Sequence, residues 1–184
     1  MFKTFSKTFF LLGSAALLFS SAAAFANSDI AVIYYSRSGN TTKTVQAVKD
    51  LTGADLYQVL PTPDYPDEYH ATTEAVKKEI ESNILHDFKP LSVDYSKYKT
   101  IVLAAPTWWG HIPSPLQKYL GTVANELAGK KVITFNSHGG SGIAQTRTDF
   151  EKAVPKADFG THLCSSGAAS KDDVEAWLKE NGIR

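Results

Sequence analysis

The sequence has a single cysteine, Cys164, among its 184 residues. One thiol cannot form a disulfide within the chain, and it cannot supply the several thiolates of an iron–sulfur or structural zinc site. The five histidines show none of the spacings typical of metal ligands. A disulfide framework is therefore excluded as the basis of the fold, and we expect no metal site.

An excess of charge of one sign is also lacking, because the chain has 19 basic and 19 acidic residues and no long block of either. A basic surplus would favour nucleic-acid binding, and a long charged run would predict a disordered tail. We therefore expect partners other than nucleic acid.

Long apolar runs are absent after the first 26 residues. Within those residues, two lysines precede an apolar run that extends from Phe9 to Phe19, and the small-x-small sequence Ala24-Phe25-Ala26 follows it. This pattern predicts a secretory signal peptide over residues 1–26 and a single domain over residues 27–184. An uncleaved anchor is the alternative, but the run is shorter than the roughly 20 residues that cross a bilayer. We expect a periplasmic or extracellular protein with no stable membrane insertion after cleavage.

Two common nucleotide-binding loops are missing. Lys43 lacks the glycine that precedes the lysine of a P-loop, and the turn at residues 36–41 has one glycine where the dinucleotide fingerprint has three. A nucleotide hydrolase is therefore disfavoured, and this turn does not form the dinucleotide fingerprint.

What is present is a turn rich in hydroxyl groups, Ser36-Arg37-Ser38-Gly39-Asn40-Thr41, between an apolar run and a helical pattern. Free N–H groups and the dipole at a helix start both favour an anion, and these side chains add hydroxyl and amide donors. The turn therefore predicts a cradle for a terminal phosphate. The alternative is an ordinary turn in which Thr41 or Thr42 caps the helix.

Five short apolar runs alternate with amphipathic stretches, which predicts an α/β fold with three layers, helices on both sides of a parallel sheet. The predicted strands are Ile30–Tyr35, Leu56–Leu60, Thr100–Ala105, Lys131–Asn136 and Gly160–Cys164. The predicted helices are Thr41–Thr52, about 69–84 (with Val76, Ile80 and Ile84 at i+4 steps), one from Ser114, about 144–153 and one from Ser170. Ligands of such sheets bind beyond the carboxyl ends of the strands, so the loops after the first, third and fourth strands should converge.

The loop after the third strand has two adjacent tryptophans, Trp108 and Trp109, between a proline and a glycine. Neighbouring side chains in an extended loop point in different directions, so at least one indole should be partly exposed. An exposed aromatic side chain in a loop usually serves binding. The alternative is that both indoles cover the end of the sheet.

The loop after the fourth strand has three glycines between residues 139 and 142. This composition suits a close approach of the backbone to a planar ligand. The sequence Gly139-Gly140-Ser141-Gly142 nearly forms the G-x-S-x-G motif of esterases, but Ile143 stands where the motif needs its last glycine. A hydrolase is therefore disfavoured.

The turn at residues 36–41, which we call the first loop, resembles the phosphate-binding loop of flavodoxins, whose pattern is close to (S/T)-x-(S/T)-G-x-T. The resemblance extends over about residues 29–184. It implies a five-stranded parallel sheet in the order 2-1-3-4-5 and bound FMN. It assigns the phosphate to the first loop. It assigns the flavin ring to the second loop (residues 106–110, after the third strand) and the third loop (residues 137–142, after the fourth strand). The implied cofactor-binding residues are Ser36, Arg37, Ser38, Gly39, Asn40, Thr41, Pro106, Thr107, Trp108, Trp109, Gly110, Ser137, His138, Gly139, Gly140, Ser141 and Gly142.

The resemblance implies a protein that transfers electrons between redox partners, either a partner protein or a small-molecule electron acceptor, and the predicted signal peptide implies that this protein is exported. Two alternatives stay open: an FMN-dependent NAD(P)H:quinone-type reductase, and a binding domain that keeps the fold without redox chemistry. The sequence departs from the usual acidic carriers at His138, which would either stabilise a reduced, anionic flavin or lie exposed without a tuning role.

Overall fold

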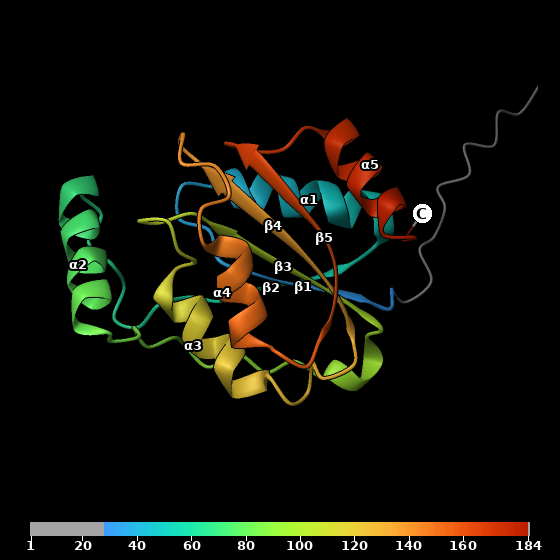
Figure 1. Ribbon diagram of the computed structural model, residues 1–184, viewed down its shortest axis with the longest axis horizontal. Coiled ribbons are helices and arrows are strands. Elements are labelled where there is room, and N and C mark those ends of the chain that lie inside the picture. Colours follow the sequence, from blue (N-terminus) through green and yellow to red (C-terminus); the bar gives the residue numbers. More distant parts are fainter. Residues whose placement is uncertain (1–27, 184) are drawn as a thin grey trace, which may run out of the picture.

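A computed structural model describes residues 28–183, so the predicted signal peptide lies outside the described residues. Five parallel strands form one sheet in the order β2-β1-β3-β4-β5 (Figure 1), which confirms the predicted α/β fold and strand order. The strands are β1 (Ile30–Tyr34), β2 (Asp55–Gln58), β3 (Thr100–Pro106), β4 (Lys131–His138) and β5 (Asp158–Ser166).

Five helices accompany the sheet: α1 (Asn40–Thr52), α2 (Tyr69–Ser82), α3 (Ser114–Val123), α4 (Thr146–Ala153) and α5 (Lys171–Glu180). A short 3-10 turn, η1, covers Tyr95–Lys97. Figure 1 shows α1 and α5 on one face of the sheet and α3 and α4 on the other. None of the helices between residues 28 and 183 combines the length and the apolar character needed to cross a membrane.

Alternation along the central strands explains the two helical layers, because successive side chains point to opposite faces. In β1, Val32 belongs to the apolar cluster that includes Val48 of α1, whereas Ile33 belongs to the cluster that includes Leu116 of α3 and Phe150 of α4. All five of these side chains are essentially inaccessible to solvent. Burying each contributes roughly 1.5–3 kcal/mol, so the two layers fix the strands and the loops at their carboxyl ends.

The edge strands are the places where the predicted bounds differ most from the structure. The fifth strand runs from Asp158 to Ser166, beyond both predicted ends at Gly160 and Cys164. Its residues are exposed or only half-buried. An edge strand carries polar residues on its open side, which shortens the apolar run by which a strand is recognised.

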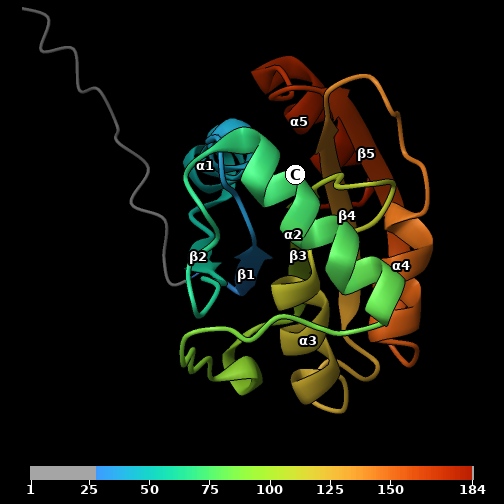
Figure 2. The same ribbon diagram turned by 90° about the vertical axis from the view of Figure 1, so that its left-hand side faces the viewer.

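The second helix does not lie on the sheet. Figure 2 shows α2 running across the end of the sheet where β1, β3 and β4 terminate. Of the predicted apolar stripe, only Val76 is buried; Ile80 is 44% exposed and Ile84 is 61% exposed. The helix ends at Ser82, and its C-cap Asn83 has a left-handed conformation (φ 51°), so Ile84 lies beyond the helix.

Candidate cofactor-binding site

The first loop ends in a helix start that no side chain caps. Helix α1 begins at Asn40, and its N-cap is Gly39 with φ 88°, a conformation that suits glycine. The alternative in which Thr41 or Thr42 caps the helix is therefore wrong. The Thr42 amide donates to Ser36 Oγ at 3.3 Å, while the amides of Gly39, Asn40 and Thr41 have no partner among residues 28–183. These three donors are available to an anion.

Arg37 connects this loop to the segment that precedes α2. Its guanidinium donates to the carbonyl oxygens of Pro66 at 3.1 Å and Asp67 at 2.7 Å. The Thr72 hydroxyl of α2 donates to the same Pro66 carbonyl at 2.6 Å. Because Arg37 has partners within the protein, the structure gives it a tethering contact, and its predicted contact with a phosphate stays a prediction.

The second loop contains a tight turn that places Trp109 at its tip. Trp108 and His111 exchange two backbone hydrogen bonds, of 2.8 and 2.9 Å. The central residues, Trp109 and Gly110, have φ values of 51° and 86°, which define a type I′ turn. Glycine suits this conformation, whereas a bulky residue in the left-handed region costs roughly 1–3 kcal/mol and is characteristic of functional sites.

The two indoles occupy different environments. Trp108 is half-buried and packs edge-on against Tyr35 and Tyr65, with ring centroids 5.2 and 5.5 Å apart. Trp109 is 57% exposed, and its Nε1 donates to the Thr73 carbonyl of α2 at 3.2 Å. One indole is thus partly exposed, as the sequence predicts, and it reaches from the second loop to α2.

Hydrogen bonds join the three loops at the carboxyl edge of the sheet. The Thr41 and Ser137 hydroxyls are 3.0 Å apart, which links the first loop to the third. The Thr107 amide donates to the Ser137 carbonyl at 2.7 Å, which links the second to the third. The Asn136 amide group donates to Thr107 Oγ1 at 2.7 Å and to the Gly142 carbonyl at 3.2 Å. The predicted convergence of the loops is therefore confirmed.

His162 of β5 fixes the buried Asn136 in this arrangement. Its Nε2 lies 2.6 Å from Asn136 Oδ1, and its Nδ1 lies 2.7 Å from Thr134 Oγ1. An amide oxygen only accepts, so Nε2 carries the proton and Nδ1 accepts from the threonine hydroxyl. Burial, and next the positive charge of Arg147, lower the pKa of His162 to about 4, so the ring is neutral at pH 7. In the sequence His162 lies two residues before Cys164, and no local pattern signals its contact with Asn136.

A cavity of about 300 Å³ lies between the second loop and α2. It brings together one predicted residue of the first loop with three of the second, and four residues of α2 complete it. The lining residues are Arg37, Thr107, Trp108, Trp109, Tyr69, Thr72, Thr73 and Val76. Tyr69 stands out in the sequence as an aromatic residue beside a proline-rich turn, whereas nothing in the sequence singles out the other α2 residues.

The third loop contributes to the edge of the site and does not line this cavity. Gly139, Gly140 and Ser141 are exposed, and His138 is half-buried. The Gly140 amide donates to His138 Nδ1 at 3.0 Å, so the imidazole shapes its own loop. The loop is attached to the rest of the site through Ser137 and Asn136, and its predicted contact with a ring stays a prediction.

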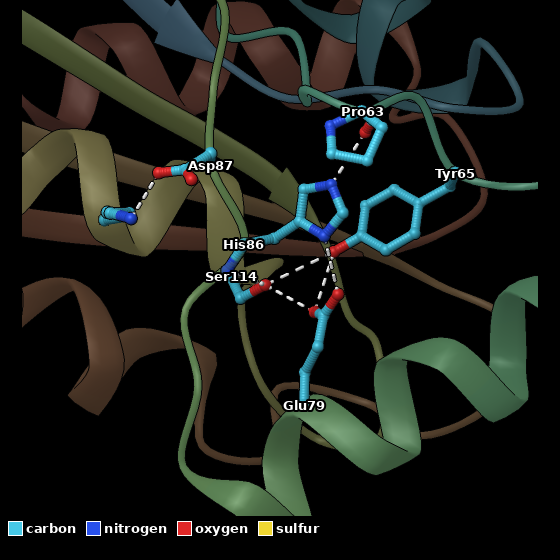
Figure 3. A network of polar contacts seen from close by, with 7 residues as sticks. Pro63, Tyr65, Glu79, His86, Asp87 and Ser114 are labelled. Carbon is cyan, nitrogen blue, oxygen red and sulfur yellow. Dashed lines mark hydrogen bonds and ion pairs between the residues drawn. The ribbon is translucent and has the colours of Figure 1, made fainter.

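A buried polar network attaches α2 to the body of the protein (Figure 3). Glu79 accepts from the Tyr65 hydroxyl at 2.8 Å and the Ser114 hydroxyl at 2.6 Å, and its other oxygen lies 2.8 Å from His86 Nδ1. His86 Nε2 lies 2.7 Å from the Pro63 carbonyl. The imidazole of His86 therefore bridges the Glu79 carboxylate of α2 and the backbone of the segment that precedes α2.

The order of the strands, the uncapped helix start after β1 and the aromatic loop after β3 define a doubly wound α/β protein whose three loops meet at its switch point. The chain belongs to the flavodoxin family, whose sequence pattern matches residues 29–181. No curated protein matches the chain.

Solved structures with the same fold include flavoproteins. A protein of Bacteroides eggerthii assigned as a flavoprotein is 22% identical, with a TM-score of 0.74 over 86% of this chain and 100% of that one. A flavoprotein of Lactobacillus acidophilus in complex with FMN is 19% identical, with a TM-score of 0.67 over 82% of this chain and 98% of that one. A WrbA-like flavodoxin of Agrobacterium tumefaciens is 15% identical, with a TM-score of 0.56 over 85% and 94%. At these identities the likeness shows the fold.

Proposed function

We propose that this chain is an exported flavodoxin that binds FMN and transfers electrons between redox partners. The observation that carries the proposal is the hydrogen-bonded junction of three loops, through Thr41, Thr107 and Ser137, beside a cavity with an exposed tryptophan. Membership of the flavodoxin family and the FMN complex of the Lactobacillus relative support it.

The residues present suit FMN. The unpartnered amides of Gly39, Asn40 and Thr41, with the exposed Ser38 hydroxyl beside them, would hold the phosphate. The exposed face of Trp109 would stack on the ring, which is worth roughly 0.5–1.5 kcal/mol beyond the area it buries. When bound, FMN supplies the one- and two-electron chemistry, while the chain sets access and potential.

The chain would exchange electrons with another protein or a small acceptor, and the match of residues 29–181 to the flavodoxin family supports this. Electron-transfer encounters usually bury little surface and are weak. We propose that the exchange takes place outside the cytoplasm, on the basis of the signal sequence at residues 1–26.

Rapid mixing of the FMN-loaded protein with NADH and NADPH tests the electron-carrier role. A carrier should react slowly with both nicotinamides and should be reduced by dithionite in two separate one-electron steps. Fast two-electron bleaching by either nicotinamide would contradict the carrier role and favour the reductase. A protein that stays colourless with excess FMN would contradict both and favour a non-redox binding domain.

A further inference from the structure

A second cavity, of about 210 Å³, lies on the other side of Trp108, between α2 and the helices α3 and α4. It shares Val76 and Trp108 with the cavity described above, so Trp108 separates the two spaces. The remaining lining residues come from α2 and the segment after it, the second loop, α3 and α4. They are Glu79, Ile80, Asn83, Ile84, Leu85, His111, Ile112, Ser114, Gln117, Asp149 and Lys152.

One wall of this cavity is apolar and belongs to α2 and the residues that follow it. Ile80, Ile84 and Leu85 all line the space, and between 38% and 61% of each of these side chains is exposed. The hydrophobic clusters of the core do not include them. Apolar side chains gathered around a cavity, rather than scattered singly, indicate a surface that binds something.

The cavity is also lined by two carboxylates, Glu79 of α2 and Asp149 of α4, which already have partners. Glu79 accepts from Tyr65 and Ser114 and pairs with His86. Asp149 is buried, and its Oδ2 lies 3.0 Å from His111 Nδ1 and accepts from the Ile112 amide at 3.2 Å. Neither acid is therefore left to attract a cation into the cavity.

Two polar side chains on the α3 and α4 side of the cavity have no partners in the part of the chain that the structure describes. Between residues 28 and 183, no side-chain hydrogen bond or ion pair is made by Lys152 or Gln117. The His111 ring is oriented by Asp149 through Nδ1, which leaves Nε2 free. The uncommitted charge facing the apolar wall is therefore the positive charge of Lys152, which favours an anion.

We propose that this cavity binds a small aromatic carboxylate, with the ring against Ile80, Leu85 and Trp108 and the carboxylate toward Lys152 and Gln117. The volume is below the roughly 300–1,000 Å³ of sites for drug-sized ligands, which suits a molecule of one ring. The proposal goes beyond the flavin site and does not depend on it. Because Trp108 borders both spaces, the bound molecule lies next to the redox site and is held independently of it.

Titration with three matched probes, followed by the indole N–H resonances in NMR spectra, tests the proposal. Benzoate carries both the ring and the charge, benzyl alcohol carries the ring alone, and acetate carries the charge alone. Benzoate should bind at least fivefold more tightly than benzyl alcohol, acetate should not bind, and the Trp108 resonance should shift while that of Trp177 does not. Equal binding of benzoate and benzyl alcohol, or a shift at Trp177 alone, would overturn the proposal.

Substitutions test the contributions of the charged and the apolar side chains to binding separately. Lys152→Gln should reduce benzoate binding to the level of benzyl alcohol and leave benzyl alcohol unchanged, whereas Ile80→Ser should weaken both. Lys156→Gln, an exposed lysine outside the cavity, is the matched control and should change neither. Retention of full benzoate affinity in Lys152→Gln would refute the assigned orientation. Since all these measurements are made without flavin, a failure of FMN binding leaves their outcome unaffected.

Discussion

The two helices nearest the candidate site, α1 and α2, are attached to the protein in different ways. Helix α1 begins directly at the first loop and buries Val45, Val48 and Leu51 against the sheet. Helix α2 borders the cavity from the other side and buries only Thr72 and Val76. The site therefore has one side fixed by the hydrophobic core and another fixed by polar contacts.

The contacts of α2 involve charged or polar groups at both of its ends. Near its start, Arg37 holds the preceding carbonyls and Trp109 reaches the Thr73 carbonyl; near its end, Glu79 pairs with His86. Segments with few buried apolar contacts open locally at a lower free energy than the core. We therefore expect α1 to unfold only with the whole domain and α2 to open alone.

The largest expected difference comes from a matched pair of charge insertions. Val48→Asp places a carboxylate in the core beneath α1 and should lower the free energy of unfolding by on the order of 4 kcal/mol or more, or prevent folding. Ile80→Asp places the same group on the exposed side of α2 and should change the free energy of unfolding by less than about 0.5 kcal/mol. Urea unfolding measures both, and a large loss in Ile80→Asp would contradict the comparison.

Lowering the pH should destabilise the folded protein through His162. Its pKa is about 4 in the folded protein and 6.5 in the unfolded chain, so the unfolded chain binds more protons between these values. The free energy of unfolding therefore falls as the pH drops from 6.5 to 4, by up to about 3 kcal/mol from this residue. Urea unfolding across this range measures the change. His162→Gln should remove this part of the pH dependence, and an unchanged slope would show that the ring is not held neutral.

The polar attachment of α2 should fail when its buried pair is broken. Glu79→Gln removes the charge opposite His86 and should lower the free energy of local opening of α2 by about 1–3 kcal/mol. Hydrogen exchange should then be faster in α2 and unchanged in α1. Glu81→Gln is the control, because Glu81 makes an exposed contact with Lys77 at 3.9 Å that is worth little. Equal exchange in the two variants would contradict the assigned role of Glu79.

The smallest effect on stability is expected at Trp109, where two consequences oppose each other. Trp109→Asn relieves the left-handed strain but loses the hydrogen bond to Thr73, so the free energy of unfolding should change by less than about 1 kcal/mol. Its affinity for FMN should nevertheless fall about tenfold, because the stacking surface is lost. Trp109→Phe keeps a ring and should retain most of the affinity; a titration that finds both variants equal to the wild type would argue against stacking.

The parts of the fold that the sequence predicts well are those in which a local pattern and its environment agree. Continuous apolar runs predict β1, β3 and β4 because these strands are buried on both faces. Ser170 is predicted to begin the last helix, and its hydroxyl accepts from the Asp173 amide at 3.1 Å.

The remaining features depend on which residues meet across the fold. The i+4 spacing of Ile80 predicts a helix but does not say that the helix crosses the strand ends with that side chain exposed. The contact between His162 and Asn136 joins two strands, and the helix start at Gly39 depends on a backbone conformation. Neither a contact between strands nor a single backbone conformation leaves a periodic signal in the sequence.

The most direct test of the account compares FMN with riboflavin, which lacks the phosphate, in fluorescence titrations of the purified protein. If the amides of Gly39, Asn40 and Thr41 hold a phosphate, FMN should bind one to one and at least about a hundredfold more tightly than riboflavin. One or two charge-assisted hydrogen bonds, at about 1.5–3 kcal/mol each, already account for that ratio. Equal affinity for the two flavins, or no binding of either, would contradict it.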